Sequence, residues 1–145
     1  MTTLTQRKQQ VGLIWAAMLS TVALYGTMSA VVVGIAHAGS ETEAEWPRHA
    51  LSTIAVACGA LSIWWHRRFL AADPPTPATL AFPQIQGHGI VTWALSEAVG
   101  ICGLLMAFMV DDAREFIPFG AAAAALLLLH RPSSLPWRRL ASPAD

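Results

Sequence analysis

Charged residues are scarce in this sequence, and their scarcity excludes the ordinary soluble domains. Only 12% of the 145 residues are charged, whereas 54% are hydrophobic. A soluble domain carries about 25% charged residues, because its surface must be solvated. We therefore expect one integral membrane domain over residues 1–145, of the all-α class, with no separate soluble domain.

Cysteine and the common catalytic motifs are also nearly absent. The two cysteines, Cys58 and Cys102, lie within apolar segments, where we expect free thiols and no disulfide. The sequence has no phosphate-binding loop and no pair of metal ligands at helical spacing. Ser96 precedes Glu97, but neighbouring helical residues point about 100° apart and do not face each other. We therefore predict no enzyme activity, no cofactor, no metal site and no nucleic-acid binding.

Four apolar segments predict a bundle of transmembrane helices. Their expected bounds are about 11–37, 48–66, 85–110 and 113–130. The connector 69–83 should be extended, because it is rich in proline: Pro74, Pro75, Pro77 and Pro83. Asp112 and Glu115 resemble a capping box that starts the fourth helix, with Pro118 in its first turn.

The first segment has a second interpretation. Arg7 and Lys8, an apolar run and the small residues around 36–38 resemble a signal peptide with its cleavage site. The apolar run exceeds the about 7–15 residues of a signal h-region. We therefore expect this segment to be retained as the first transmembrane helix.

The formal net charge is zero, but the charges are sorted by loop. Basic residues precede the first segment and follow the second and fourth: Arg7, Lys8, Arg67, Arg68, Arg131, Arg138 and Arg139. The other two loops are mostly acidic, with Glu41, Glu43, Glu45, Asp111, Asp112 and Glu115 against Arg48 and Arg114. The positive-inside rule then predicts cytoplasmic N and C termini, in the inner membrane of a bacterial cell.

Glu97 lies at the midpoint of the third apolar segment and is the main candidate for function. A charged residue at the bilayer centre costs about 2.5–3.5 kcal/mol on insertion scales, so it normally faces protein or water. We predict that Glu97 binds a proton or a sodium ion. The alternative is a structural hydrogen bond to another helix, with Ser52, Thr53 or Thr92 as the partner.

Small residues form a stripe on each of the second and third segments. The stripes consist of Ser52, Ala55, Gly59 and Ser62, and of Gly89, Ser96, Gly100 and Gly103. Their spacings place each set on one helical face. Such faces let helix backbones approach closely, so we expect helix packing through them and a homo-oligomer or a partner subunit in a membrane complex.

Five histidines fall near the predicted membrane interfaces: His37, His49, His66, His88 and His130. There we expect them to be polar tips at the level of the lipid headgroups. His88 lies about two and a half helical turns before Glu97. It is an alternative candidate for a cytoplasmic proton entrance.

The third segment resembles a known family. Residues 94–108 read Ala-Leu-Ser-Glu-Ala-Val-Gly-Ile-Cys-Gly-Leu-Leu-Met-Ala-Phe. This stretch is similar to the carboxylate helix of subunit c, the proteolipid of rotary ATP synthases and vacuolar-type ATPases, and the resemblance extends over about 86–110. It implies that Glu97 is an ion carrier, protonated while it faces lipid and deprotonated at the half-channels of a stator. The second and third segments also match that family's hairpin, with Arg67, Arg68, Pro83 and Gln84 in the loop.

The rest of the chain departs from that family. The second segment has only Gly59 where the family's partner helix is rich in glycine, and the connector is longer and richer in proline. The acid lies on the third of four segments, and no internal duplication is evident. Two functions are therefore expected: proton or sodium translocation through Glu97, or a non-catalytic accessory or assembly subunit in which Glu97 is structural.

Overall fold

The structure is a computed structural model that describes residues 4–36, 45–72 and 81–137. Within these ranges the chain is helical and contains no strand, which confirms the all-α class. The α-helices are α1 (Leu4–Ala36), α2 (Glu45–Ala71), α3 (Ala81–Val110) and α4 (Phe116–Leu129). Two short 3₁₀-helices flank α4, namely η2 (Ala113–Glu115) and η3 (Pro132–Ser134).

Three of the helices extend beyond the apolar segments that predicted them. α1 already begins at Leu4, because the polar residues that follow, such as Gln6 and Lys8, are good helix formers. α3 begins at Ala81, with Pro83 in its first turn, where the missing N–H has no helical partner to lose. Pro83 therefore belongs to the helix and not to the connector, whose other prolines lie outside the described residues.

The start of α4 differs from the predicted capping box. Asp112 Oδ1 accepts a hydrogen bond from the N–H of Arg114 at 2.9 Å and so caps η2. The Glu115 carboxylate instead accepts a hydrogen bond from Arg48 of α2 at 2.7 Å. α4 consequently begins at Phe116, and Pro118 lies in its first turn as predicted.

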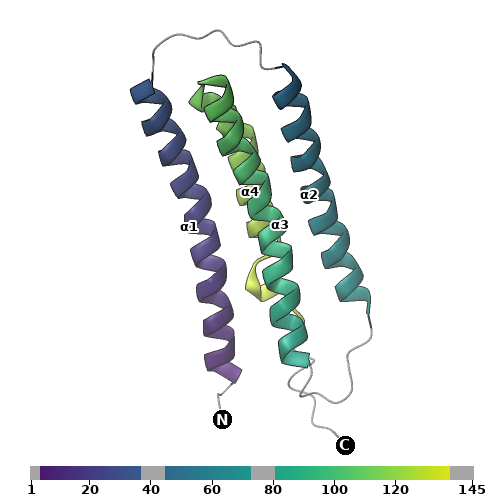
Figure 1. The fold of residues 1–145 in the computed structure, drawn as a ribbon. Coiled ribbons are helices and arrows are strands. Elements are labelled where there is room, and N and C mark those ends of the chain that lie inside the picture. The colour runs from purple at the N-terminus through teal and green to yellow at the C-terminus, as the bar shows by residue number, and fades with distance from the viewer. Residues whose placement is uncertain (1–3, 37–44, 73–80, 138–145) are drawn as a thin grey trace, which may run out of the picture.

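α3 is the central helix of an up-and-down bundle (Figure 1). It packs against α1, α2 and α4, whereas α2 and α4 scarcely touch each other. The start of α1 and the end of α4 meet, because Trp15 Nε1 donates a hydrogen bond to the Leu127 carbonyl oxygen at 2.8 Å. We call the end of the bundle at which α1 begins and α4 ends the basic end, since it carries Arg7, Lys8, Arg67, Arg68 and Arg131. The opposite end is the acidic end, which carries Glu45, Asp111, Asp112 and Glu115.

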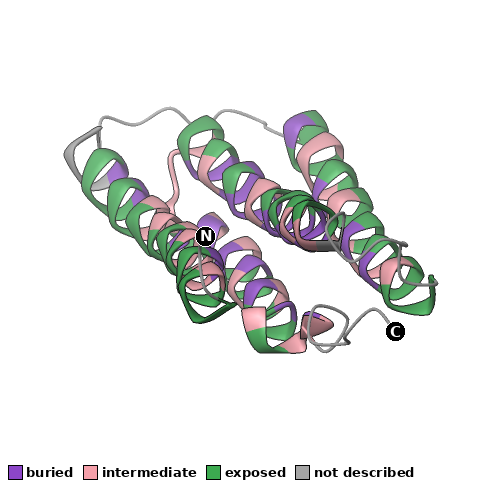
Figure 2. Ribbon diagram, turned by 90° about the horizontal axis from the view of Figure 1, so that it is seen from below, coloured by how far each residue is buried: buried purple, intermediate pink, exposed green. Residues whose placement is uncertain are grey.

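Large apolar side chains point outward from all four helices. They include Leu13, Val56, Phe108 and Leu129, which are exposed on α1, α2, α3 and α4, and Figure 2 shows exposed positions along the outer side of each helix. Two helices, over Leu4–Val33 and Phe82–Val110, are long and apolar enough to cross a membrane. Exposed apolar faces of this extent are compatible with membrane association.

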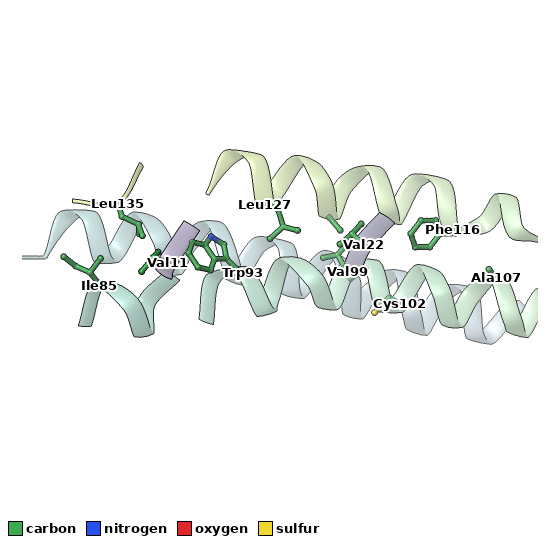
Figure 3. Close-up of a cluster of buried hydrophobic side chains, with 12 residues drawn as sticks. Val11, Val22, Ile85, Trp93, Val99, Cys102, Ala107, Phe116, Leu127 and Leu135 are labelled. Carbon is green, nitrogen blue, oxygen red and sulfur yellow. The ribbon is translucent and has the colours of Figure 1, made fainter. Parts of the chain in front are cut away.

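The buried apolar side chains form a strip between α3 and the pair α1 and α4. Figure 3 shows them following one another from Ile85 and Val11 near the basic end to Phe116 and Ala107 near the acidic end. Both cysteines are free, as predicted: Cys102 is buried and Cys58 is half-buried. The strip fixes how α1 and α4 rotate about α3, and that rotation decides which polar residues meet.

Candidate functional site

Glu97 lies on α3 and faces α1. Tyr25 Oη of α1 donates a hydrogen bond to Glu97 Oε1 at 3.0 Å, and both side chains are half-buried. The Tyr25 ring lies beside Gly100, where an added Cβ atom would be 3.7 Å from Tyr25 Cδ2. Helix α1 therefore partly covers the carboxylate, and the Tyr25 ring packs against α3 at Gly100, which has no side chain.

The structure gives Glu97 a different partner from those predicted. Thr92 and Thr53 donate their hydrogen bonds to carbonyl oxygens of their own helices, at 2.8 Å to His88 and 2.7 Å to His49. Ser52 lines a groove between α2 and α4. The prediction of these three partners was wrong, because Glu97 faces α1 and its carboxylate accepts the hydrogen bond from Tyr25. Glu97 lies about 100° around the helix from Ser96, which is the residue that does face α2.

Three histidines from three helices come together near the basic end. His66 on α2, His88 on α3 and His130 at the end of α4 are exposed by only 9%, 5% and 1%. His66 Nδ1 lies 3.1 Å from His88 Nε2, and the ring centroids of His66 and His130 are 4.7 Å apart. The prediction that they are polar tips was wrong for these three, because their side chains are buried among the helices. His49 is exposed as expected, and His37 lies outside the described residues.

Hydroxyl groups continue this arrangement along α2 and α3. Ser62 Oγ lies 3.2 Å from Ser96 Oγ and 3.3 Å from His130 Nδ1. It also donates to the Thr92 carbonyl oxygen at 3.2 Å, and both serines are fully buried. We call these six residues the polar cluster: Ser62, His66, His88, Thr92, Ser96 and His130.

Aromatic side chains enclose the polar cluster. The Phe69 ring stacks on His88 with centroids 3.8 Å apart and an interplanar angle of 7°. Trp93 is buried and donates a hydrogen bond from Nε1 to the His130 carbonyl oxygen at 2.6 Å, which satisfies a carbonyl at the end of α4. These apolar walls strengthen the hydrogen bonds inside, because they lower the local dielectric.

Two ring nitrogens of the polar cluster are buried without a hydrogen-bond partner, His88 Nδ1 and His130 Nε2. Among the described residues, no group of three or more His, Cys, Asp or Glu side chains is arranged to hold a metal ion. Imidazole, hydroxyl and carboxyl groups at hydrogen-bond distance are suited to accepting and donating protons. The arrangement is therefore suited to moving protons.

The two small-residue stripes meet at Ser62 and Ser96. On α3, Gly100 and Gly103 face α1 and α4, because a Cβ atom at Gly103 would overlap that of Phe119 on α4. Gly89 lies under the ring of Trp93 from its own helix. The other members of the α2 stripe, Ser52, Ala55 and Gly59, line an open apolar groove between α2 and α4, with a volume of about 370 Å³.

The sequence did contain a signal for the polar cluster. Ser62 and His66 are four residues apart, and His88, Thr92 and Ser96 follow one another at the same spacing. Residues four apart share a helical face, so each set predicts a polar face on an otherwise apolar helix.

Together, the fold and these side chains define a helical bundle with buried histidine and hydroxyl groups, and one carboxyl group, between apolar helices. No protein-family model, curated protein or solved structure matches the chain. The function is therefore argued from the geometry of this chain.

Proposed function

We propose that this chain is a multi-pass membrane protein in which α1 to α4 all cross the bilayer. The apolar outward faces of all four helices support this, and so does the separation of charges between the two ends. α4 has 14 residues and η2 has three, which together span about 27 Å at about 1.5 and 2.0 Å per residue. That length is close to the about 30 Å of the hydrocarbon core. By the positive-inside rule, the basic end faces the cytoplasm.

The function that the geometry supports best is proton exchange at Glu97. The hydrogen bond between Tyr25 and Glu97 carries this proposal. The phenol donates to the carboxylate when Glu97 is ionised, and a protonated Glu97 donates to the phenol oxygen in turn. The pair keeps a hydrogen bond in both protonation states, so Glu97 takes up and releases a proton without separation of α1 from α3.

The resemblance to subunit c enters this proposal in a limited way. In that family the carboxylate faces lipid between encounters with the stator, whereas here Tyr25 of α1 covers it. We therefore propose exchange within the bundle, and not a rotor ring. An accessory role is the second candidate, because the same hydrogen bond also fixes α1 on α3.

Carbodiimide labelling separates these two functions. Carbodiimides react with protonated carboxyls in apolar surroundings, so we would label the protein in native-like membranes between about pH 6 and about pH 9, with and without sodium. Mass spectrometry then reads the modification at Glu97, and Glu97→Gln is the blank. Labelling that falls as the pH rises supports proton exchange, and protection by sodium identifies the ion as sodium. A Glu97 that is unlabelled throughout leaves only the structural role.

The Tyr25→Phe variant tests the hydrogen bond itself. Without the phenol, the ionised carboxylate loses its donor, so we expect labelling of Glu97 to persist to higher pH. Ser29→Ala is the matched control, since this buried hydroxyl on α1 donates only to Gly26 of its own helix at 2.9 Å. A Tyr25→Phe protein whose labelling profile equals that of Ser29→Ala would contradict a role for the phenol.

A further inference from the structure

The last turns of α2 present an exposed surface at the basic end. A hollow of about 580 Å³ lies on this surface, lined by Ala60, Ile63, Trp64, Arg67 and Arg68. The last four residues follow Ala60 by three, four, seven and eight positions, so all five share one face of the helix. All of them except Ile63 are exposed. We call this the arginine hollow.

The arginine hollow changes from apolar to basic along the axis of α2. Ala60 and Ile63 lie toward the middle of the bundle, and Arg67 and Arg68 lie one to two turns closer to the basic end. The seven residues from Ala60 to Arg67 correspond to about 10.5 Å of helix. Each interfacial layer of a bilayer is about 5–8 Å thick, which is half the difference between the whole bilayer and its hydrocarbon core. The hollow is therefore long enough to reach from the headgroup layer into the hydrocarbon.

The guanidinium group of Arg68 is held toward the bilayer. Its Cζ atom lies 5.3 Å from the centroid of the Trp64 ring, one turn earlier on α2. Because α2 runs toward the basic end, this contact brings the charge back toward the middle of the bundle. An arginine at a membrane surface usually extends its charged group toward water. The cation–π contact instead keeps Arg68 at the level of a tryptophan, the residue that is enriched where lipid headgroups meet the hydrocarbon.

No carboxylate among the described residues lies at the basic end. The ion pair between Arg48 and Glu115 is at the acidic end. α1, which carries Arg7 and Lys8, is on the other side of α3 from α2 (Figure 1). The two adjacent arginines of the hollow repel each other, and an anion bound between them offsets this repulsion. The charge of the hollow therefore fits an anionic ligand.

We propose that the arginine hollow binds one anionic phospholipid, with its phosphate at Arg67 and Arg68 and the start of its acyl chains along Ala60 and Ile63. Guanidinium groups donate paired hydrogen bonds to phosphate oxygens, and basic pockets at the cytoplasmic side of membrane proteins bind anionic headgroups. A soluble phosphate would leave the apolar part of the hollow unoccupied, which favours a lipid. This inference rests on the proposed membrane embedding of α1 to α4, and it is independent of exchange at Glu97.

Native mass spectrometry of the full chain in detergent micelles tests the site. Phosphatidylglycerol and phosphatidylcholine with the same acyl chains are added over a range of concentrations, and the lipids retained by each protein are counted. We expect one phosphatidylglycerol to bind at concentrations at which phosphatidylcholine does not. Arg67→Gln and Arg68→Gln should each weaken this binding about fivefold, the effect of one basic residue close to an anionic surface. Both side chains are exposed, so the variants should fold, and circular dichroism checks this.

Arg131→Gln is the matched control, because Arg131 is exposed at the same end but does not line the arginine hollow. It should leave the binding of phosphatidylglycerol unchanged. If Arg131→Gln weakens the binding as much as Arg67→Gln and Arg68→Gln do, the charge of the whole basic end attracts the lipid, and the site is wrong. Equal retention of the two lipids by the unmodified chain would also overturn the site.

A competitor distinguishes a lipid from a soluble phosphate. Glycerol 3-phosphate has the phosphate but no acyl chains, so it should not displace phosphatidylglycerol. Displacement by glycerol 3-phosphate at the concentration of the lipid would mean that the hollow takes a soluble phosphate, and the lipid proposal would fail.

The same preparation keeps this proposal apart from the proposed function. Carbodiimide labelling of Glu97 should be equal in Arg67→Gln and in the unmodified chain. A chain that does not enter micelles contradicts the membrane proposal. A chain that enters micelles, is labelled at Glu97 and retains both lipids equally contradicts only the lipid site.

Discussion

Helices α3 and α4 approach closely where Gly103 meets Phe119, and this contact predicts the effect of a single methyl group. A Cβ atom at Gly103 would overlap the Cβ of Phe119 and lie 3.3 Å from Cδ2 of Phe116. A Cβ atom moves only with its backbone, so rotation of the Phe119 side chain cannot relieve the overlap. We expect Gly103→Ala to force α4 away from α3.

The magnitude follows from two opposing effects. Overpacking of a tight contact costs about 1–3 kcal/mol, whereas alanine is favoured over glycine within a helix by about 0.5–1 kcal/mol. The matched control is Gly87→Ala on the same helix, where an added Cβ atom meets nothing within 4 Å. Gly87→Ala should therefore stabilise the protein, and Gly103→Ala should be less stable than Gly87→Ala by about 1–3 kcal/mol.

Reversible unfolding in mixed micelles gives both values. Increasing fractions of a denaturing detergent unfold the protein, circular dichroism follows the loss of helix, and the free energy of unfolding is compared at a common detergent fraction. If Gly103→Ala proves as stable as Gly87→Ala, the close approach of α4 to Gly103 is refuted.

Further predictions concern the polar cluster and the thiols. Ser62→Ala should lower the free energy of unfolding by about 0.6–1.7 kcal/mol, the range for hydrogen bonds between membrane helices. Ser20→Ala should change the free energy of unfolding by less than about 0.5 kcal/mol, as surface substitutions do. The same detergent titration measures both values, and equal losses would contradict the buried network. A maleimide should label the half-buried Cys58 before the buried Cys102, and mass spectrometry at timed intervals would expose the opposite order.

The helical class was predictable because composition and long apolar segments leave few alternatives. The helix bounds were less accessible, since hydropathy marks where a chain is apolar and not where its backbone hydrogen bonds end. α2 continues through Arg67 and Arg68 to Ala71, and α3 begins before its apolar stretch. Polar residues with good helix propensity extend these helices beyond the segments that predicted them.

The candidate site was predictable in part. Glu97 stands out because a carboxyl group within an apolar helix is rare. Its partner Tyr25 is 72 residues away in the sequence, and their contact depends on how α1 rotates about α3. That rotation is set by the packing of the apolar strip, which includes Val22 and Val99. No local sequence pattern predicts the rotation of one helix about another.

The burial of the histidines was missed for a related reason. Each was judged by its distance from the end of an apolar segment, which put it at a membrane interface. Because α2 and α3 extend further, His66 and His88 lie more than one turn inside their helices. Helix α4 ends at the same level and adds His130, so residues that are unremarkable one by one become a buried cluster.

The position of α1 bears most directly on the resemblance to subunit c. In a rotor ring the carboxylate must leave its neighbours and meet a stator at the outer surface, so here α1 would have to move away and the Tyr25 hydrogen bond would have to break. The polar cluster lies on another face of α3, between α2 and α4, and reaches the depth of Glu97 without any such movement. The fold therefore places Glu97 against α1 and the polar cluster between α2 and α4, whereas a ring requires the loss of the contact between α1 and Glu97.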